Sequence, residues 1–152
     1  PTFSNVNELT ILENRFFDGT EYYDTNIKLF DEDAPSFTLA IDYEFLNTTS
    51  NNGTLVSCYE ETGNEGFRLR YSSNPDIQWG DRNVNVGYQD NRNIVVIRHQ
   101  KGSRTMFVYG FNMEGSTYSM TPVSAELVRT RSTVSDAVLS LGAVGFGDGG
   151  HD

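Results

Sequence analysis

Residues 37–45 alternate strictly between apolar and polar side chains. The apolar set is Phe37, Leu39, Ile41, Tyr43 and Phe45, and the polar-facing set is Thr38, Ala40, Asp42 and Glu44. A period of two is typical of a strand with one buried face. A loop containing Asn51, Asn52 and Gly53 follows, and then the apolar run 54–60. This order predicts a hairpin in which residues 54–60 return antiparallel beside residues 37–45.

A second hairpin is predicted around residues 72–75, and its register follows from parity. The core face would carry Phe67, Leu69, Tyr71, Ile77 and Trp79. A three-residue loop places Leu69 opposite Ile77, Arg68 opposite Gln78 and Arg70 opposite Asp76, which is a favourable charge pair. A five-residue loop also keeps the parity. Loops of two or four residues would set Arg70 beside Ile77 on one face and are disfavoured.

Two later runs, 94–97 and 105–109, are apolar on both faces and are joined by residues 100–103. Such runs are typical of strands in the middle of a sheet. Residues 137–141 predict a late strand, and residues 145–152 read as a flexible, glycine-rich tail. A short turn at residues 124–128 is the one helical feature that the pattern allows. Strands spaced by about ten residues with turn signals between them predict an all-β, two-sheet antiparallel sandwich.

Composition agrees with this fold class and narrows the function. The 152 residues suit one domain, and 10 Phe, 8 Tyr and 14 Gly favour strands and turns over helices. A net charge of −10 would repel a phosphate backbone, so the chain lacks the footprint of a nucleic-acid binder. Cys58 has no partner cysteine and is expected in the core. No apolar run reaches the length of a membrane span, and no signal peptide precedes the domain.

The beginning of the chain resembles a known family. The residues that carry the likeness are Phe17-Asp18-Gly19-Thr20, Tyr23, Asp24-Thr25, Ile27 and Leu29. They resemble the opening strand pair of laminin-G-like domains, and residues 37–45, 66–71 and 93–99 follow in the order that this family leads one to expect. The chain looks most like the modules found in bacteriophage structural proteins and prophage-encoded surface proteins. The resemblance implies a concanavalin A-like jelly roll located on a virion or an extracellular surface.

Such domains usually close with a further strand that returns beside the first one. Here the sequence ends at Gly149-Gly150-His151-Asp152, with nothing apolar left to form it. We therefore expect the closing strand to lie outside this sequence, to come from a neighbouring chain, or to be missing so that the edge stays open.

A catalytic role is disfavoured by one residue. Laminarinase-type hydrolases of this fold place carboxylates at alternate positions of one strand, as Glu-x-Asp-x-Glu, so that nucleophile and acid flank a glycosidic bond. Ala40, Asp42 and Glu44 match that spacing, but Ala40 stands at the nucleophile position. Asp42 and Glu44 are more simply the solvated face of a strand. His99, at a strand end, is expected to hydrogen-bond locally, and neither His99 nor His151 belongs to a visible triad or zinc motif. We expect no enzyme activity.

A calcium site is conceivable, because laminin-G-like and lectin domains often hold Ca²⁺ on rim loops with carboxylates and backbone carbonyls. The candidates by loop position are Asp31, Asp33 and Asp81, with Glu32 between the first two. Clusters of two or three acids are also commonly just solvated. The sequence therefore marks these positions without assigning a ligand set.

A glycan site would need polar groups aimed at hydroxyls and an aromatic platform. Trp79 is the only tryptophan, but it shares a face with Ile77, so a place in the core is favoured. Arg68, Arg70 and Gln78 fall on the opposite face and, with Tyr88, predict a polar groove. Their simpler reading is an exposed sheet face with an Arg70–Asp76 pair. Arg129 and Arg131 form a small basic spot, and two glycosylation sequons begin at Asn47 and Asn52.

Three functions follow in order of preference. The first is a non-enzymatic carbohydrate-binding or adhesion module that recognises a glycan or cell-surface polysaccharide. The second is a structural domain that decorates a virion or mediates assembly with other chains, including oligomers of its own. The third is a β-glucan hydrolase of the same fold.

Overall fold

The computed structural model describes residues 23–32, 34–44, 53–60, 65–71, 75–86, 92–114, 117–128 and 137–142. Every regular element in these ranges is a strand. The strands are β1 (Tyr23–Lys28), β2 (Phe37–Glu44), β3 (Gly53–Glu60), β4 (Glu65–Tyr71), β5 (Asp76–Trp79), β6 (Arg82–Asn85), β7 (Arg92–His99), β8 (Thr105–Glu114), β9 (Thr117–Val128) and β10 (Val138–Leu141). Within the same ranges no helix has the length and hydropathy needed to cross a membrane.

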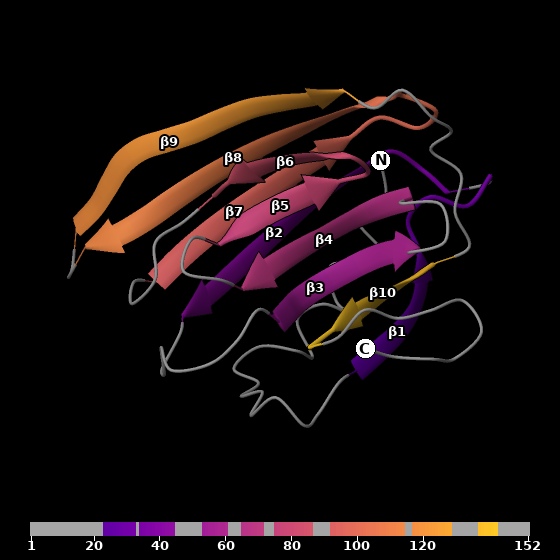
Figure 1. Ribbon diagram of the computed structural model, residues 1–152, viewed down its shortest axis with the longest axis horizontal. Helices are drawn as coiled ribbons and strands as arrows, with labels where there is room; N and C mark the ends of the chain where they lie inside the picture. Colours follow the sequence, from indigo (N-terminus) through magenta and orange to yellow (C-terminus); the bar gives the residue numbers. More distant parts are fainter. Residues whose placement is uncertain are drawn as a thin grey trace.

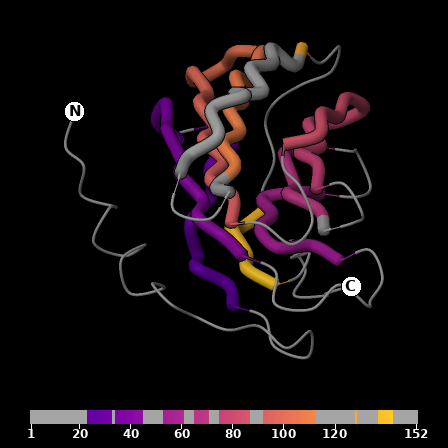
Figure 2. Tube along the Cα trace, turned by 90° about the vertical axis from the view of Figure 1, so that its left-hand side faces the viewer, coloured from indigo at the N-terminus to yellow at the C-terminus, as the bar shows by residue number. Residues whose placement is uncertain are grey.

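The strands form two antiparallel sheets. Sheet A has six strands in the order β1-β10-β3-β4-β5-β6, and sheet B has four in the order β2-β7-β8-β9. Sheet A lies in front of sheet B in Figure 1. Figure 2 shows the layers from the side, with the magenta strands β3 and β4 of sheet A on one side and the purple strand β2, the coral strand β7 and the orange strand β8 of sheet B on the other. The all-β, two-sheet antiparallel architecture predicted from the sequence is confirmed, and it is compatible with a β-sandwich.

Alternation explains why the two sheets share one core. In β2 and β7 every second side chain points inward, and the same holds for β4 and β5 in sheet A. The buried contributors include Leu39, Val95, Ile97, Met106 and Val108 from sheet B, and Phe67, Leu69, Ile77 and Trp79 from sheet A. Each such side chain contributes roughly 1.5–3 kcal/mol by leaving water. Phe30, just after β1, packs among Phe37, Phe67, Trp79 and His99 with ring centroids 5.1–6.1 Å apart.

The first predicted hairpin is wrong. Strand β2 pairs with β7 along its whole length, from Phe37 opposite His99 to Glu44 opposite Arg92, and β3 lies in the other sheet between β10 and β4. Residues 45–52 separate β2 from β3. A connection of that length does not impose pairing as a two-residue turn does, so the long apolar match with β7 decides the partner of β2.

The predictions for the second hairpin and for the two later strands are confirmed. Leu69 lies opposite Ile77, Arg68 opposite Gln78 and Arg70 opposite Asp76, which confirms the predicted register of β4 and β5. Strands β7 and β8 pair in the interior of sheet B, as their two-sided apolar patterns indicated.

One expectation about the later chain is corrected, and one is confirmed. Residues 124–128 belong to strand β9 and do not form a turn. The predicted late strand is β10, and it pairs with both β1 and β3. The first strand therefore has a partner from late in the chain, and the further closing strand that the family resemblance leads one to expect stays a prediction. The tail predicted at residues 145–152 lies outside the described ranges.

Candidate functional site

The outer face of sheet A carries a continuous row of polar side chains. Because Phe67, Leu69, Ile77 and Trp79 point into the core, the residues between them point outward. Cross-strand pairing then aligns one polar residue from each strand: Asp24, Ser140, Ser57, Arg68, Gln78 and Asn83. We call the part of this surface on β3 to β6 the polar face, defined by Tyr59, Arg68, Arg70, Asp76, Gln78 and Asn83.

Gln78 lies at the centre of the polar face and is held on three sides. Its Oε1 accepts a hydrogen bond from Arg68 Nε at 2.8 Å. Its amide nitrogen donates to the Tyr59 hydroxyl oxygen at 3.2 Å and to the Gly80 carbonyl oxygen at 2.8 Å. The Arg68 guanidinium lies 4.5 Å from the centroid of the Tyr59 ring, a cation–π contact. These contacts fix Arg68 and Gln78 in one geometry before any ligand binds.

The neighbouring pair is a bidentate ion pair. Arg70 Nε donates to Asp76 Oδ1 at 3.0 Å and its NH2 nitrogen donates to Oδ2 at 2.5 Å, while Asn83 Nδ2 donates to Oδ2 at 3.2 Å. The Asp76 side chain is 8% exposed and that of Arg70 is 34% exposed. The hydrogen bonds that Arg70 donates to Asp76 raise the pKa of Arg70 above its ordinary value. Arg70 therefore stays charged and its guanidinium is held in one orientation, while about a third of its side chain is exposed to solvent.

The polar row continues beneath the surface toward the other edge of sheet A. Ser140 donates from its hydroxyl to Asp24 Oδ1 at 2.7 Å. Ser57 and Ser140 are fully buried although they lie on the outward side of their strands. Buried polar groups are retained only where they are hydrogen-bonded. The row thus contains buried, hydrogen-bonded polar groups such as Ser140 in addition to partly exposed side chains.

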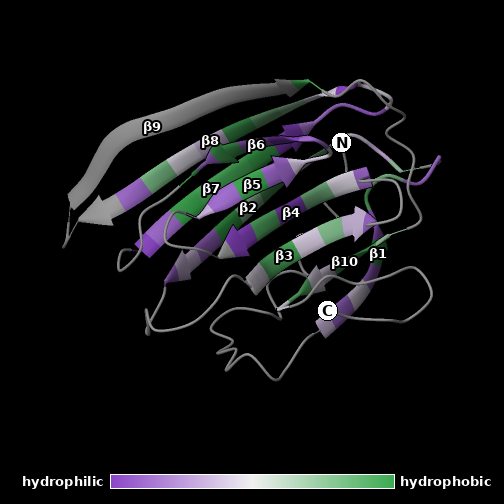
Figure 3. Ribbon diagram, viewed as in Figure 1, coloured by the Kyte–Doolittle hydropathy of each residue, from purple (hydrophilic) through white to green (hydrophobic). Residues whose placement is uncertain are grey.

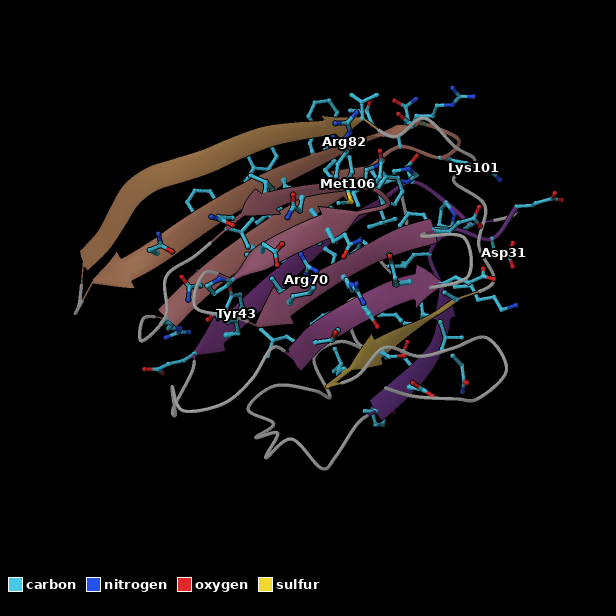
Figure 4. All side chains as sticks on the ribbon, in the orientation of Figure 1. Asp31, Tyr43, Arg70, Arg82, Lys101 and Met106 are labelled. Carbon is cyan, nitrogen blue, oxygen red and sulfur yellow. The ribbon has the colours of Figure 1, made fainter. Side chains whose placement is uncertain are left out.

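The structure brings together three of the five predicted ligand residues. Arg68, Arg70 and Gln78 lie side by side on β4 and β5, and Figure 4 shows the labelled Arg70 on the outer side of sheet A. Trp79 has no exposed surface and donates from its indole nitrogen to the Arg104 carbonyl oxygen at 3.1 Å. Its place is the core, so it offers no stacking platform. Tyr88 lies outside the described residues.

Sequence reasoning missed Tyr59, Ser57 and Asn83 as members of this surface. Alternation along β3 could have placed Ser57 and Tyr59 on the outer side of the strand, because Cys58 between them points into the core. Strand β3 pairs with β4, and this pairing brings Tyr59 next to Arg68. It was not predicted, because the sequence pattern suggested that residues 54–60 pair with residues 37–45. Asn83 lies on the short strand β6, which was not predicted because residues 82–85 show no clear apolar pattern.

Two of the three predicted calcium ligands, Asp31 and Asp81, lie in the described part of the chain, and they belong to different loops. The Asp31 carbonyl oxygen accepts a hydrogen bond from the Ala34 amide at 3.0 Å, and Asp31 lines a pocket of about 80 Å³ with His99 and Lys101. Asp81 lies between β5 and β6, with a carboxylate oxygen 3.7 Å from Arg82 Nε. Figure 4 shows Asp31 far from Arg82. Asp33 lies outside the described residues, and the residues that are described contain no group of three or more His, Cys, Asp or Glu able to hold a metal ion.

The carboxylates of the hydrolase-like spacing lie on the outer face of sheet B. Asp42 and Glu44 are exposed, and Ala40 shares their face. The Asp42 carboxylate accepts two hydrogen bonds from Arg92, at 2.8 and 2.5 Å. These residues occupy the solvated position that the alternation predicted, and Asp42 is engaged in an ion pair.

The remaining candidate nucleophiles and bases serve the fold. His99 is buried, and its Nε2 lies 2.9 Å from the Ser103 carbonyl oxygen, which confirms the expected local hydrogen bond. Cys58 is fully buried and donates from Sγ to the Ala137 carbonyl oxygen at 3.2 Å. Burial raises the pKa of Cys58 to about 12, so it remains an unreactive thiol. Arg129, Arg131, His151, Asn47 and Asn52 lie outside the described residues.

No protein-family model matches the chain, and no curated protein has a significantly similar sequence.

Proposed function

We propose that the chain is a non-enzymatic carbohydrate-binding or adhesion module with a concanavalin A-like jelly-roll topology, of the kind found on phage virions and bacterial surface proteins. The polar face is its binding surface. The observation that carries the proposal is that Arg68, Gln78 and Arg70 are each fixed by hydrogen bonds on one sheet surface while part of each side chain stays accessible. A preorganised set of donors and acceptors is what recognition of sugar hydroxyls requires.

Recognition on this face would depend on hydrogen bonds more than on stacking. Tyr59, the aromatic residue at its centre, is 1% exposed and lies under Arg68. Gln78 and Arg68 are half-buried, and Asn83 and Asn85 at the adjoining strand β6 are exposed. Guanidinium and amide groups can each engage two neighbouring hydroxyls of a sugar ring. The expected ligand is a polysaccharide chain lying across β4, β5 and β6.

A glycan array with the purified chain tests the proposal. Arg68→Met and Gln78→Met remove hydrogen-bonding groups from the polar face, and Arg98→Met makes the same change on the exposed outer side of sheet B as a control. Binding that is lost in the first two variants and kept in the third supports the proposal. Binding that survives both polar-face variants, or an array without any signal from the folded wild type, contradicts it.

Repeating the array with EDTA addresses the calcium prediction for Asp31, Asp33 and Asp81. Binding that disappears with EDTA and returns with added Ca²⁺ would support a metal on these rim loops. Binding that is indifferent to EDTA would leave the polar face as the whole recognition surface.

The second candidate is a structural decoration or assembly domain without a small ligand. It is favoured by a different observation: Ile94, Val96 and Phe107 point outward from sheet B. An apolar surface of this kind suits contact with protein better than contact with water. A silent glycan array together with self-association would favour this candidate.

A further inference from the structure

We propose that a pocket at the end of strand β7 binds a small molecule that carries a primary ammonium group. The pocket lies between the segment that follows β1 and the turn that follows β7, and its volume is about 80 Å³. We call it the rim pocket and define it by Phe30, Asp31, Glu32, His99 and Lys101. None of these residues belongs to the polar face, so the inference goes beyond the proposed function.

Two short turns form the rim pocket. The Ala34 amide donates to the Asp31 carbonyl oxygen at 3.0 Å, and a backbone hydrogen bond of 2.9 Å closes the turn at residues 100–103. The Lys101 amide donates to the Ser36 hydroxyl oxygen at 3.0 Å, which ties this turn to the segment before β2. Figure 4 shows the labelled Asp31 and Lys101 at the same end of the molecule. Because these hydrogen bonds hold both turns, the pocket is formed in advance of a ligand.

His99 occupies a core position on β7. Ile97, the preceding inward residue, is fully buried, and Figure 3 shows the hydrophobic segment of this strand. His99 itself is 4% exposed, and the ring centroids of Phe30, Phe37 and Trp79 lie 5.2–5.5 Å from that of its imidazole. A buried imidazole is costly unless its nitrogens are hydrogen-bonded, whereas an apolar side chain would carry no such cost. Histidine at this position therefore needs partners for both nitrogens.

The Nδ1 atom of His99 is the group that a ligand would complete. Nε2 lies 2.9 Å from the Ser103 carbonyl oxygen, which can only accept, so Nε2 carries the proton of the neutral ring. Nδ1 is then an acceptor, and it is buried without a hydrogen-bond partner among the described residues. Because His99 lines the rim pocket, a donor seated there is placed to complete this atom.

The charges around the rim pocket favour a cationic donor. Asp31 and Glu32 bring two carboxylates to its lining and Lys101 brings one ammonium, which leaves one negative charge in excess. Lys101 is exposed, so its side chain can extend into solvent away from a bound cation. The Phe30 ring adds an aromatic surface that attracts cations. A primary ammonium group offers three donors and a positive charge, whereas a neutral hydroxyl would gain little from the carboxylates.

The size of the rim pocket restricts the ligand to a few heavy atoms. A cavity of about 10–15 Å³ holds one water molecule, so about 80 Å³ has room for several atoms of that size. Ethanolamine fits this description, as does the ammonium end of an amino sugar. A ligand this small makes few contacts, and a dissociation constant of about 0.1 to 10 mM is expected.

An NMR titration of the full chain with ethanolamine tests the proposal, at about pH 7.5, where the imidazole is mostly neutral, and with EDTA present to exclude metal ions. Ethylene glycol is the matched probe, because it replaces the ammonium group with a hydroxyl. Saturable shifts of the Lys101 and Gly102 amide signals are expected with ethanolamine, and at least tenfold weaker binding with ethylene glycol. No saturable shift up to about 50 mM ethanolamine, or equal binding of the two probes, overturns the proposal.

Glucosamine and N-acetylglucosamine distinguish two sources of the ammonium group. Binding of glucosamine as tight as that of ethanolamine supports the amino group of an amino sugar as the occupant, and binding of ethanolamine alone supports a free small amine. Binding of N-acetylglucosamine as tight as that of glucosamine contradicts recognition of an ammonium group, because the acetylated nitrogen carries no charge.

Variants assign the binding to the rim pocket. His99→Gln keeps a donor for the Ser103 carbonyl oxygen but lacks the Nδ1 acceptor, so ethanolamine should bind at least tenfold more weakly. Glu32→Gln should weaken binding about threefold, and Lys101→Gln should tighten it, because each changes the charge beside the cation. Glu44→Gln is the matched control for Glu32→Gln, since Glu44 is also exposed but lies on the outer face of sheet B.

Unchanged binding in a folded His99→Gln variant, equal effects of Glu32→Gln and Glu44→Gln, or weaker binding in Lys101→Gln would each contradict the site. Arg68→Met should leave ethanolamine binding unchanged, because Arg68 lies on the polar face. The glycan array and this titration therefore fail or succeed independently.

Discussion

The two sheets present different chemistry to the outside although their inner faces are built alike. Both contribute buried aliphatic and aromatic side chains to one core. Outward, sheet A carries a hydrogen-bonded polar row that includes fully buried Ser57 and Ser140, whereas sheet B carries Ile94, Val96 and Phe107. The core needs only the inner faces, so the outer faces can differ: one is a hydrogen-bonded polar surface, and the other mixes apolar with charged side chains.

An Arg–Asp ion pair of the same geometry on each face makes the comparison quantitative. Arg70 with Asp76 and Arg92 with Asp42 both join Nε to Oδ1 and NH2 to Oδ2 across adjacent strands. The Asp76 side chain is 8% exposed, and that of Asp42 is 44% exposed. Burial is the main difference between the pairs, and it determines what each contributes.

The largest expected effect comes from breaking the backbone beneath the polar face. Gly66 pairs with Tyr59 and has a φ of +85°, and a Cβ there would lie 1.9 Å from the Cys58 carbonyl oxygen. Gly66→Ala should therefore cost at least about 3 kcal/mol of unfolding free energy, from clash and backbone strain. Gly53→Ala is the matched control in β3, because nothing lies within 4 Å of its Cβ position. Urea denaturation of both variants measures the difference. Similar unfolding free energies for the two would refute the tight approach of β4 to β3.

The ion pairs should give the next largest effect. Asp76→Ala leaves a half-buried guanidinium and the Asn83 amide without their acceptor and should cost about 2 kcal/mol. Asp42→Ala removes an exposed pair and should cost less than about 0.5 kcal/mol. Both values come from the same denaturation experiment at neutral pH. Equal losses in the two variants would mean that the two outer faces do not differ in burial as described.

The smallest effect concerns the inner face of sheet B and emerges only on acidification. Because the Ser103 carbonyl oxygen only accepts, His99 Nε2 carries the proton, and Nδ1 is buried without a hydrogen-bond partner. Desolvation lowers the pKa of His99, although the hydrogen bond to Ser103 opposes the shift. The folded state thus binds a proton less readily than the unfolded state. Its stability should fall as the pH drops below about 6.5, the ordinary value, and level off below the lowered pKa.

A variant without the imidazole isolates this contribution. His99→Gln keeps a donor for the Ser103 carbonyl oxygen and cannot be protonated in this range. The difference in unfolding free energy between wild type and variant, followed from pH 7.5 down to pH 5.5, should shrink in the acidic part. A difference that stays constant with pH would show that His99 titrates alike in both states.

Alternation and local spacing determined much of this protein from the sequence alone. A period of two in residues 37–45 and 67–79 was enough to predict which side chains face the core, the register of β4 with β5, and the outward place of Arg68, Arg70 and Gln78. These features depend on residues close together in the chain, where parity leaves few alternatives. The core position of Trp79 followed from the same pattern, and that of Cys58 from its place in an apolar run without a partner cysteine.

Only the tertiary structure decided which strands lie in the same sheet. Strand β2 pairs with β7 rather than β3, β10 returns beside β1, and Tyr59 reaches Arg68 and Gln78 through pairings between distant segments. A strand pattern states which face is apolar but not which neighbour will complete the ladder, since that choice depends on competition among all strands for core area and hydrogen bonds. The polar row across sheet A and the apolar side chains on the outer side of sheet B are therefore recognisable as surfaces only once the strand order is known.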